Sequence, residues 1–110
     1  MKKVLILGVD CLERQVVIKA LLAGNKIRFA DSVEAAVSLC RDADVIALGT
    51  NHKGAVARFF EEGFRGIIIP ILVGKEKGMM VNGKSVIAVQ PRELPDIIAD
   101  ILNELERIAA

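Results

Sequence analysis

The sequence predicts a single α/β domain in which helices cover both faces of a parallel sheet. Short apolar runs alternate along the chain with longer stretches of helical period. The apolar runs are continuous rather than alternating with polar residues, which indicates strands buried on both faces. A chain of 110 residues is long enough to bury one core, so residues 1–110 are expected to form one domain.

The amino-terminal part predicts three strands, at residues 3–7, 26–30 and 44–48. The first helix is expected to end at Gly24 and Asn25 and to bury Leu12, Val16, Ala20 and Leu21. The second helix has Asp31 or Ser32 as its cap and a shared apolar face made of Val33, Ala36, Val37 and Cys40. The buried position makes Cys40 a packing residue.

The carboxyl-terminal part predicts a third helix, capped by Asn51 and ending at Gly63. A fourth strand is expected at residues 66–73, where Pro70 cannot donate to a ladder and favours an edge or an entry turn. A fifth strand is expected at residues 85–89. The last helix opens at Leu94-Pro95-Asp96 and is expected to bury Ile97, Ile101, Leu105 and Ile108.

The connection at residues 74–84 is too short for a normal helical crossover. It contains Asn82-Gly83 between strand-like residues, the strongest hairpin signal in the chain. We therefore expect the fourth helix to be short or replaced by a hairpin.

Two stretches resemble the receiver domains of two-component response regulators. "VLILGVDCLERQVVIKALLAGNKIRFADSVEAAVSL" follows the family's rhythm of strand, acidic turn, helix, strand and helix. "VQPRELPDIIADIL" resembles the family's final turn and helix. The resemblance implies a flavodoxin-like three-layer sandwich with a five-stranded parallel sheet in the order 2-1-3-4-5.

The same resemblance implies a phosphorylation site whose key residues are missing here. Gly8 and Val9 stand where the family has its Mg²⁺-binding acidic pair, and only the neighbouring Asp10 is acidic. Gly49 stands at the place of the phosphoacceptor aspartate. Gly74 or Lys75 replaces the hydroxyl residue after the fourth strand, and Gln90 replaces the lysine after the fifth. We therefore expect a non-phosphorylatable signalling or regulatory domain with no enzyme activity, catalytic residue, metal or cofactor.

Glycines at three strand ends suggest a different use of the same edge of the sheet. Backbone amides at Gly8, Gly49 and Gly74 would allow a ligand to approach closely at the switch point of the sheet. Polar residues that follow the strands could assist an anion: Thr50, Asn51, Lys53 and Lys75. The alternative function is thus a sensor of a nucleotide or another small phosphate-bearing ligand, and the competing interpretation is that these glycines only serve turns.

A third candidate function rests on Cys11. The stretch "ADVIALG" is similar to a strand of the cysteine-phosphorylated components of sugar phosphotransferase systems. Cys11 is followed by Leu12, Glu13 and Arg14, and two bulky residues and a carboxylate make a poor phosphate cradle.

Composition limits the partners. The formal charge of +1 and the absence of Trp and Tyr argue against nucleic acid, and no apolar run is long enough to span a membrane. We expect a cytoplasmic protein that binds a protein partner or a second copy of itself. Met79 and Met80 at the expected hairpin are the candidate interface, because methionines make adaptable apolar contacts.

Overall fold

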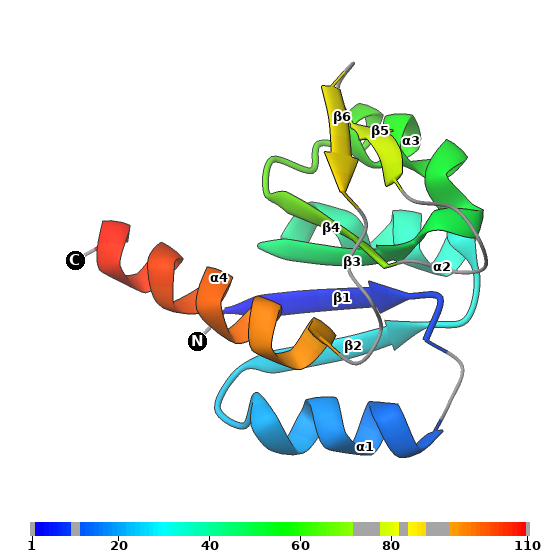
Figure 1. Ribbon diagram of the computed structural model, residues 1–110. Coiled ribbons are helices and arrows are strands. Elements are labelled where there is room, and N and C mark those ends of the chain that lie inside the picture. Colours follow the sequence, from blue (N-terminus) through cyan, green and yellow to red (C-terminus); the bar gives the residue numbers. More distant parts are fainter. Residues whose placement is uncertain (1, 10–11, 72–77, 82–83, 88–92, 110) are drawn as a thin grey trace.

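A four-stranded parallel sheet lies at the centre of the computed structural model, which describes residues 2–9, 12–71, 78–81, 84–87 and 93–109. Its strands are β1 (Lys3–Leu7), β2 (Lys26–Ala30), β3 (Val45–Gly49) and β4 (Ile67–Ile71). They are ordered β2-β1-β3-β4, so within the described residues β2 and β4 are the edge strands (Figure 1). This confirms the predicted parallel α/β class and the first four positions of the predicted strand order.

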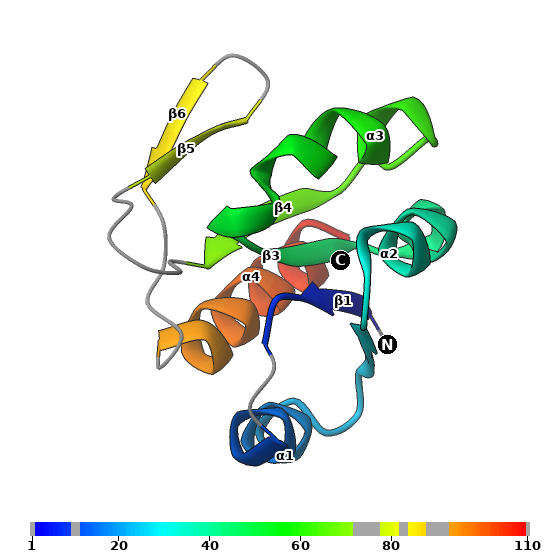
Figure 2. The ribbon, with the colours of Figure 1, turned by 90° about the vertical axis from the view of Figure 1, so that its right-hand side faces the viewer.

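Helices cover both faces of the sheet (Figure 2). One face carries α1 (Leu12–Leu21) and α4 (Leu94–Ala109), and the other carries α2 (Val33–Leu39) and α3 (Val56–Glu61). Buried residues form a core on each side of the strands, because successive side chains of a strand point to opposite faces. The α1/α4 side includes Val4, Ile6, Ile18, Leu22, Ile98 and Leu102, and the α2/α3 side includes Leu5, Leu7, Ala36, Cys40, Phe59 and Phe64.

The buried face of α1 differs from the predicted one. Val16 is 66% exposed and Ala20 is also exposed, whereas Ile18 and Leu22 are buried. The apolar residues of this helix are distributed around its circumference rather than along one face, so the sequence pattern does not show which face is buried. In α4, Ile98 and Leu102 are buried at the centre, and the predicted Ile97, Ile101 and Leu105 pack beside them half-buried. Among the helices described, none combines the length and apolar character needed to cross a membrane.

The start of α2 agrees with the sequence, and the start of α3 does not. Ser32 caps α2, and its hydroxyl oxygen accepts a hydrogen bond from the Ala35 amide at 3.2 Å. Asn51 does not begin an α-helix, because residues Thr50–Ala55 form the 3₁₀ segment η2 and α3 starts only at Val56. His52 departs from helical backbone angles, so η2 is kinked at this residue.

A hairpin stands between β4 and α4, where we predicted a short fourth helix or a hairpin followed by a fifth strand. Strands β5 (Gly78–Val81) and β6 (Lys84–Ile87) pair antiparallel, with Met79 opposite Val86. This confirms the hairpin at Asn82-Gly83. The prediction of a fifth sheet strand at 85–89 is wrong in the described part, because residues 84–87 pair with β5 in a separate two-stranded sheet. The hairpin stands beside η2 and β4, away from β1 and β2 (Figure 1).

Pro70 lies inside β4, which is an edge strand among the described residues. An edge was one of the two places that the sequence allowed for this proline, although the predicted five-strand order had put the fourth strand between the third and the fifth. The amide of Ile67 donates to the Asp44 carbonyl oxygen at 3.1 Å, so the amide of Ile67 faces the Asp44 side of the strand. Backbone amides alternate sides along a strand. The nitrogen of Pro70 therefore faces away from β3, where its missing proton costs no hydrogen bond within the sheet.

Candidate functional site

The carboxyl ends of β1 and β3 meet through two glycines. Gly8 follows β1, Gly49 ends β3, and the preceding residues Leu7 and Leu48 are register partners. Gly8 has a φ of 104°, a backbone conformation that favours glycine. A Cβ atom at Gly8 would lie 3.1 Å from both the Cα and the amide nitrogen of Gly49. The two backbones therefore approach each other closely.

Of the residues next to these glycines, Val9 is buried and Asn51 is exposed. Val9 is buried in the core beneath α1 and α4, so its side chain does not line the strand ends. Asn51 is exposed, and its Oδ1 lies 3.9 Å from the position that a Cβ at Gly8 would take. The structure thus brings together Gly8, Gly49 and Asn51 from the predicted set.

The other predicted site residues lie further along the chain, in η2 and β5. The backbones of Thr50 and Lys53 lie in η2, and those of Met79 and Met80 lie in β5. The predicted anion site at a helix N-terminus is not built as expected, because η2 is a kinked 3₁₀ segment and α3 has no side-chain cap. Other predicted positions lie outside the described residues: Asp10, Cys11, Gly74, Lys75 and Gln90.

Cys40 is a core residue, as the sequence predicts. Its side chain is fully buried, and its Sγ donates to the Val37 carbonyl oxygen at 3.1 Å. Burial raises the pKa of the Cys40 thiol, and the negative charge of Glu62 raises it further, so the thiol stays protonated at neutral pH. Within the part of the chain that the structure describes, no group of three or more His, Cys, Asp and Glu residues could hold a metal ion.

Three cations that were not predicted as site residues lie at the opposite, amino end of the sheet: Lys3, Lys26 and Arg28. A signal was present, because Lys26 and Arg28 alternate with Ile27 and Phe29 along β2. Such alternation indicates a strand with one polar face.

Comparison with protein-family models and with curated proteins finds no match for this chain. The receiver resemblance therefore rests on the residues quoted from the sequence.

Proposed function

We propose that this chain is a receiver-like regulatory domain that is not phosphorylated and acts by binding a protein partner or a second copy of itself. Two features of the fold support the receiver part of this proposal. The parallel order 2-1-3-4 matches the first four strands of the flavodoxin-like order, and helices lie on both faces of the sheet.

The close approach of Gly8 and Gly49 is the observation that best supports the proposed loss of phosphorylation. A side chain at residue 8 would be strained by the φ of 104° and would push the Gly49 backbone by a few tenths of an ångström, since a Cβ there lies 3.1 Å from it. Val9 is buried in the core, and Gly49 has no side chain. Aspartyl phosphorylation needs carboxylates to bind Mg²⁺ and one more to accept the phosphoryl group. The residues at these three positions supply neither.

The hairpin is the proposed interaction surface. Strand β5, which contains Met79 and Met80, lies beside η2 and β4 rather than within the main sheet. Methionines adapt to irregular apolar partners, so a hairpin that carries two of them suits protein binding. The competing role of these methionines is to pack over the edge of the sheet.

Amide chemical shifts test whether the receiver chemistry is lost. We expect the amides of residues 8, 9 and 49 to stay unchanged when Mg²⁺ and a phosphoryl analogue such as beryllofluoride are added together. Saturable shifts at these amides would show that the strand ends still bind the phosphoryl group, and the proposal would then be wrong.

Sedimentation of a variant tests the hairpin surface. Changing Met79→Ser together with Met80→Ser is expected to abolish self-association, because the apolar contact area is lost. Val16→Ser is the matched control, because Val16 is a 66% exposed apolar residue on α1, far from the hairpin in sequence. An unchanged oligomeric state in the double variant would contradict the proposal for a second copy.

The alternative proposal is a sensor of a small phosphate-bearing ligand at the carboxyl ends. The proximity of Gly8, Gly49 and the exposed Asn51 favours it. A panel of nucleotides and sugar phosphates should then shift the amides of residues 8 and 49–51. If the chemical shifts of these amides do not change with any compound of the panel, the protein-binding function is favoured.

A further inference from the structure

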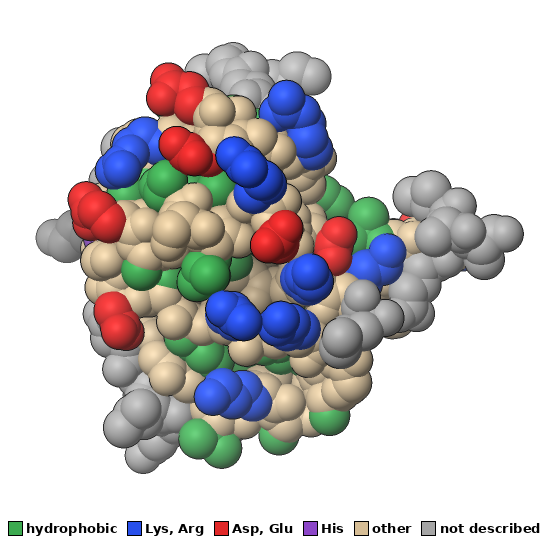
Figure 3. All heavy atoms as spheres, turned by 180° about the vertical axis from the view of Figure 1, so that it is seen from behind, with side chains coloured by type: hydrophobic (Ala, Val, Ile, Leu, Met, Phe, Trp, Pro, Cys, Tyr) green, Lys and Arg blue, Asp and Glu red, His purple; other side chains and the backbone are tan. Residues whose placement is uncertain are grey.

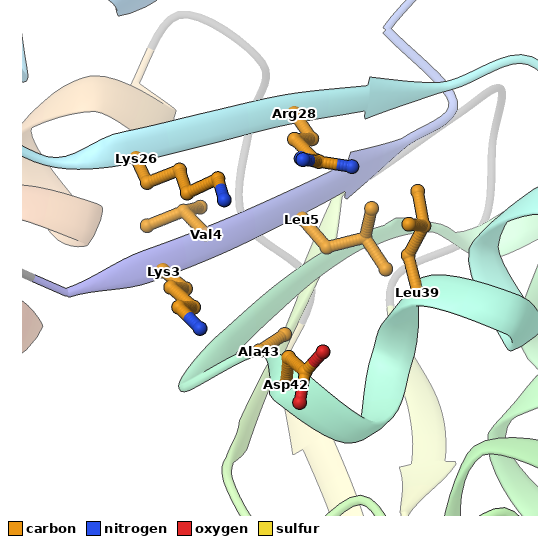
Figure 4. A pocket seen from close by; sticks show the side chains of 8 residues that line it. All are labelled: Lys3, Val4, Leu5, Lys26, Arg28, Leu39, Asp42 and Ala43. Carbon is orange, nitrogen blue, oxygen red and sulfur yellow. The ribbon is translucent and has the colours of Figure 1, made fainter.

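A pocket of about 90 Å³ lies at the amino ends of β1 and β2, on the face of the sheet that carries α2. We call it the basic pocket and define it by Lys3, Leu5, Lys26, Arg28, Leu39 and Asp42. Figure 4 shows the cationic side chains extending from the two strands over this space, with Leu39 and Asp42 across from them. In the view from behind, Lys and Arg side chains gather near the middle of the surface (Figure 3).

The pocket exists because α2 is short. Seven residues give this helix a length of about 10 Å, and it ends at Leu39, after which η1 (Cys40–Asp42) leads toward β3. Leu5 is buried beneath this end of the helix, whereas Lys26 and Arg28 on the edge strand stay exposed. The pocket therefore has apolar walls on one side and cations on the other.

The register of the strands places the cations together. Lys3 and Lys26 are register partners, and Arg28 lies opposite Leu5 two residues further along. Because side chains alternate between faces, all of these residues point to the same face. Like charges directly opposite each other on a sheet are destabilising. A bound anion would relieve this repulsion between Lys3 and Lys26.

Among the residues that the structure describes, the cations of the pocket make no direct ion pair with the carboxylate in its lining. Asp42 is the one acidic residue among those that line the pocket. Within the described chain, no ion pair joins Asp42 to Lys3, Lys26 or Arg28. Three cations thus stand near two carboxylates, Asp42 in the pocket lining and Asp44 beside it, whose carboxylate accepts a hydrogen bond from the Lys3 amide at 2.9 Å. The side-chain donors of the three cations remain available to a ligand.

We infer that the basic pocket binds the phosphate group of a small molecule. A phosphate can accept hydrogen bonds from the Arg28 guanidinium and from both lysine ammonium groups, and charge-assisted bonds of this kind are the strong ones. The pocket is small, about 90 Å³, so we expect it to hold one phosphate group rather than a whole nucleotide. The rest of the ligand would extend past the β2 edge.

This site differs in place from the crevice that the sequence predicts. It lies at the amino ends of the strands, whereas Gly8 and Gly49 lie at the carboxyl ends. The inference goes beyond the proposed protein-binding function, and neither depends on the other.

Titration of the full chain with inorganic phosphate tests the inference. We expect saturable amide shifts confined to residues 3–5, 26–28 and 39–43, and no such shifts with chloride at matched ionic strength. A second titration with a nucleoside monophosphate separates the sources of the phosphate group. Equal affinity indicates free phosphate as the ligand, and tighter binding of the nucleotide indicates that the rest of the molecule contributes.

Charge-removing variants locate the site. Lys26→Gln combined with Arg28→Gln should weaken phosphate binding at least about tenfold. Both residues are exposed, so the variant is expected to fold, and thermal unfolding in chloride checks this. Lys19→Gln is the matched control: Lys19 lies on α1 and contacts the Phe29 ring, on the other face of β2, so phosphate affinity should stay within about twofold.

Three results would overturn the inference. The first is wild-type phosphate affinity in the double variant. The second is a set of shifts that chloride reproduces, and the third is saturable shifts at residues 8 and 49 in place of those at the pocket.

Discussion

The two ends of the sheet are built in contrasting ways. At the carboxyl end, Gly8 and Gly49 bring the backbones of two neighbouring strands into close approach. At the amino end, Lys3, Lys26 and Arg28 extend around a pocket. Ligands of open α/β sheets usually bind at the carboxyl end. Among the described residues of this chain, three exposed cations gather at the other end. A fold therefore predicts where to look first, but the side chains decide what is there.

A backbone clamp underlies the amino end. The Asp44 amide donates to the Lys3 carbonyl oxygen at 2.8 Å, and an Asp44 carboxylate oxygen accepts from the Lys3 amide at 2.9 Å. The Asp44 carbonyl oxygen accepts from Ile67 at 3.1 Å. Asp44 therefore ties the starts of β1, β3 and β4 together, and Gly66 packs directly against it.

Substitution of Gly66 should give the largest effect. A Cβ at residue 66 would lie 2.1 Å from the Asp44 carbonyl oxygen, so Gly66→Ala must move the backbone that holds three strand starts. We expect a loss of about 3 kcal/mol in the free energy of unfolding, measured by denaturant titration. Gly54→Ala is the control, because nothing lies within 4 Å of its Cβ position. Equal stability of the two variants would show that the backbone around Asp44 can move to admit a side chain at residue 66 without loss of stability.

Substitution of Gly8 should give an intermediate effect and measures the tightness of the carboxyl end. Gly8 and Gly24 have φ angles of 104° and 93°, so alanine is strained at both and should cost about 1–2 kcal/mol. Only Gly8→Ala also brings a Cβ within 3.1 Å of Gly49, which should cost about 1 kcal/mol more. The difference between the two variants in urea unfolding isolates this contact. No difference would show that the strand ends can separate to admit a side chain.

Removal of one cation should give the smallest effect, and of opposite sign. Lys26→Gln relieves the repulsion with its register partner Lys3, so the free energy of unfolding in phosphate-free buffer should rise by about 0.3 kcal/mol. Lys26→Arg keeps the charge and should give no gain. The gain should shrink in high salt, because exposed charges are screened. A loss of stability on Lys26→Gln would show that Lys26 serves packing rather than charge.

The sequence predicted the four strands of the sheet because each is a short apolar run between turn signals. It could not settle the fate of residues 85–89, because an apolar run of this length fits a sheet strand and a hairpin arm equally well. The Asn82-Gly83 signal was strong enough to predict the hairpin, and the pairing of Met79 with Val86 follows from it. The buried face of α1 was also ambiguous, because the apolar residues of that helix are distributed around its circumference.

Of the candidate site, the sequence named two glycines that the structure places together, but it did not give the geometry between them. The glycines at residues 8 and 49 are evident in the sequence, but the distance between their backbones depends on how β1 and β3 pair. The basic pocket needed the register of Lys3 with Lys26 and the short length of α2, and neither follows from a single sequence pattern. Three-dimensional pairing, rather than residue type, was the missing information at both ends.

Pro70 has a consequence for the behaviour of the chain in concentrated solution. The segment "IIIPI" of β4 is almost wholly apolar, and an apolar edge strand is a template on which strands of other molecules can add. Proline in place of an amide donor interrupts the row of hydrogen bonds that such an added strand would need. Pro70 is itself buried in the folded chain, so it would act as a gatekeeper against aggregation when this end of β4 is transiently exposed during folding.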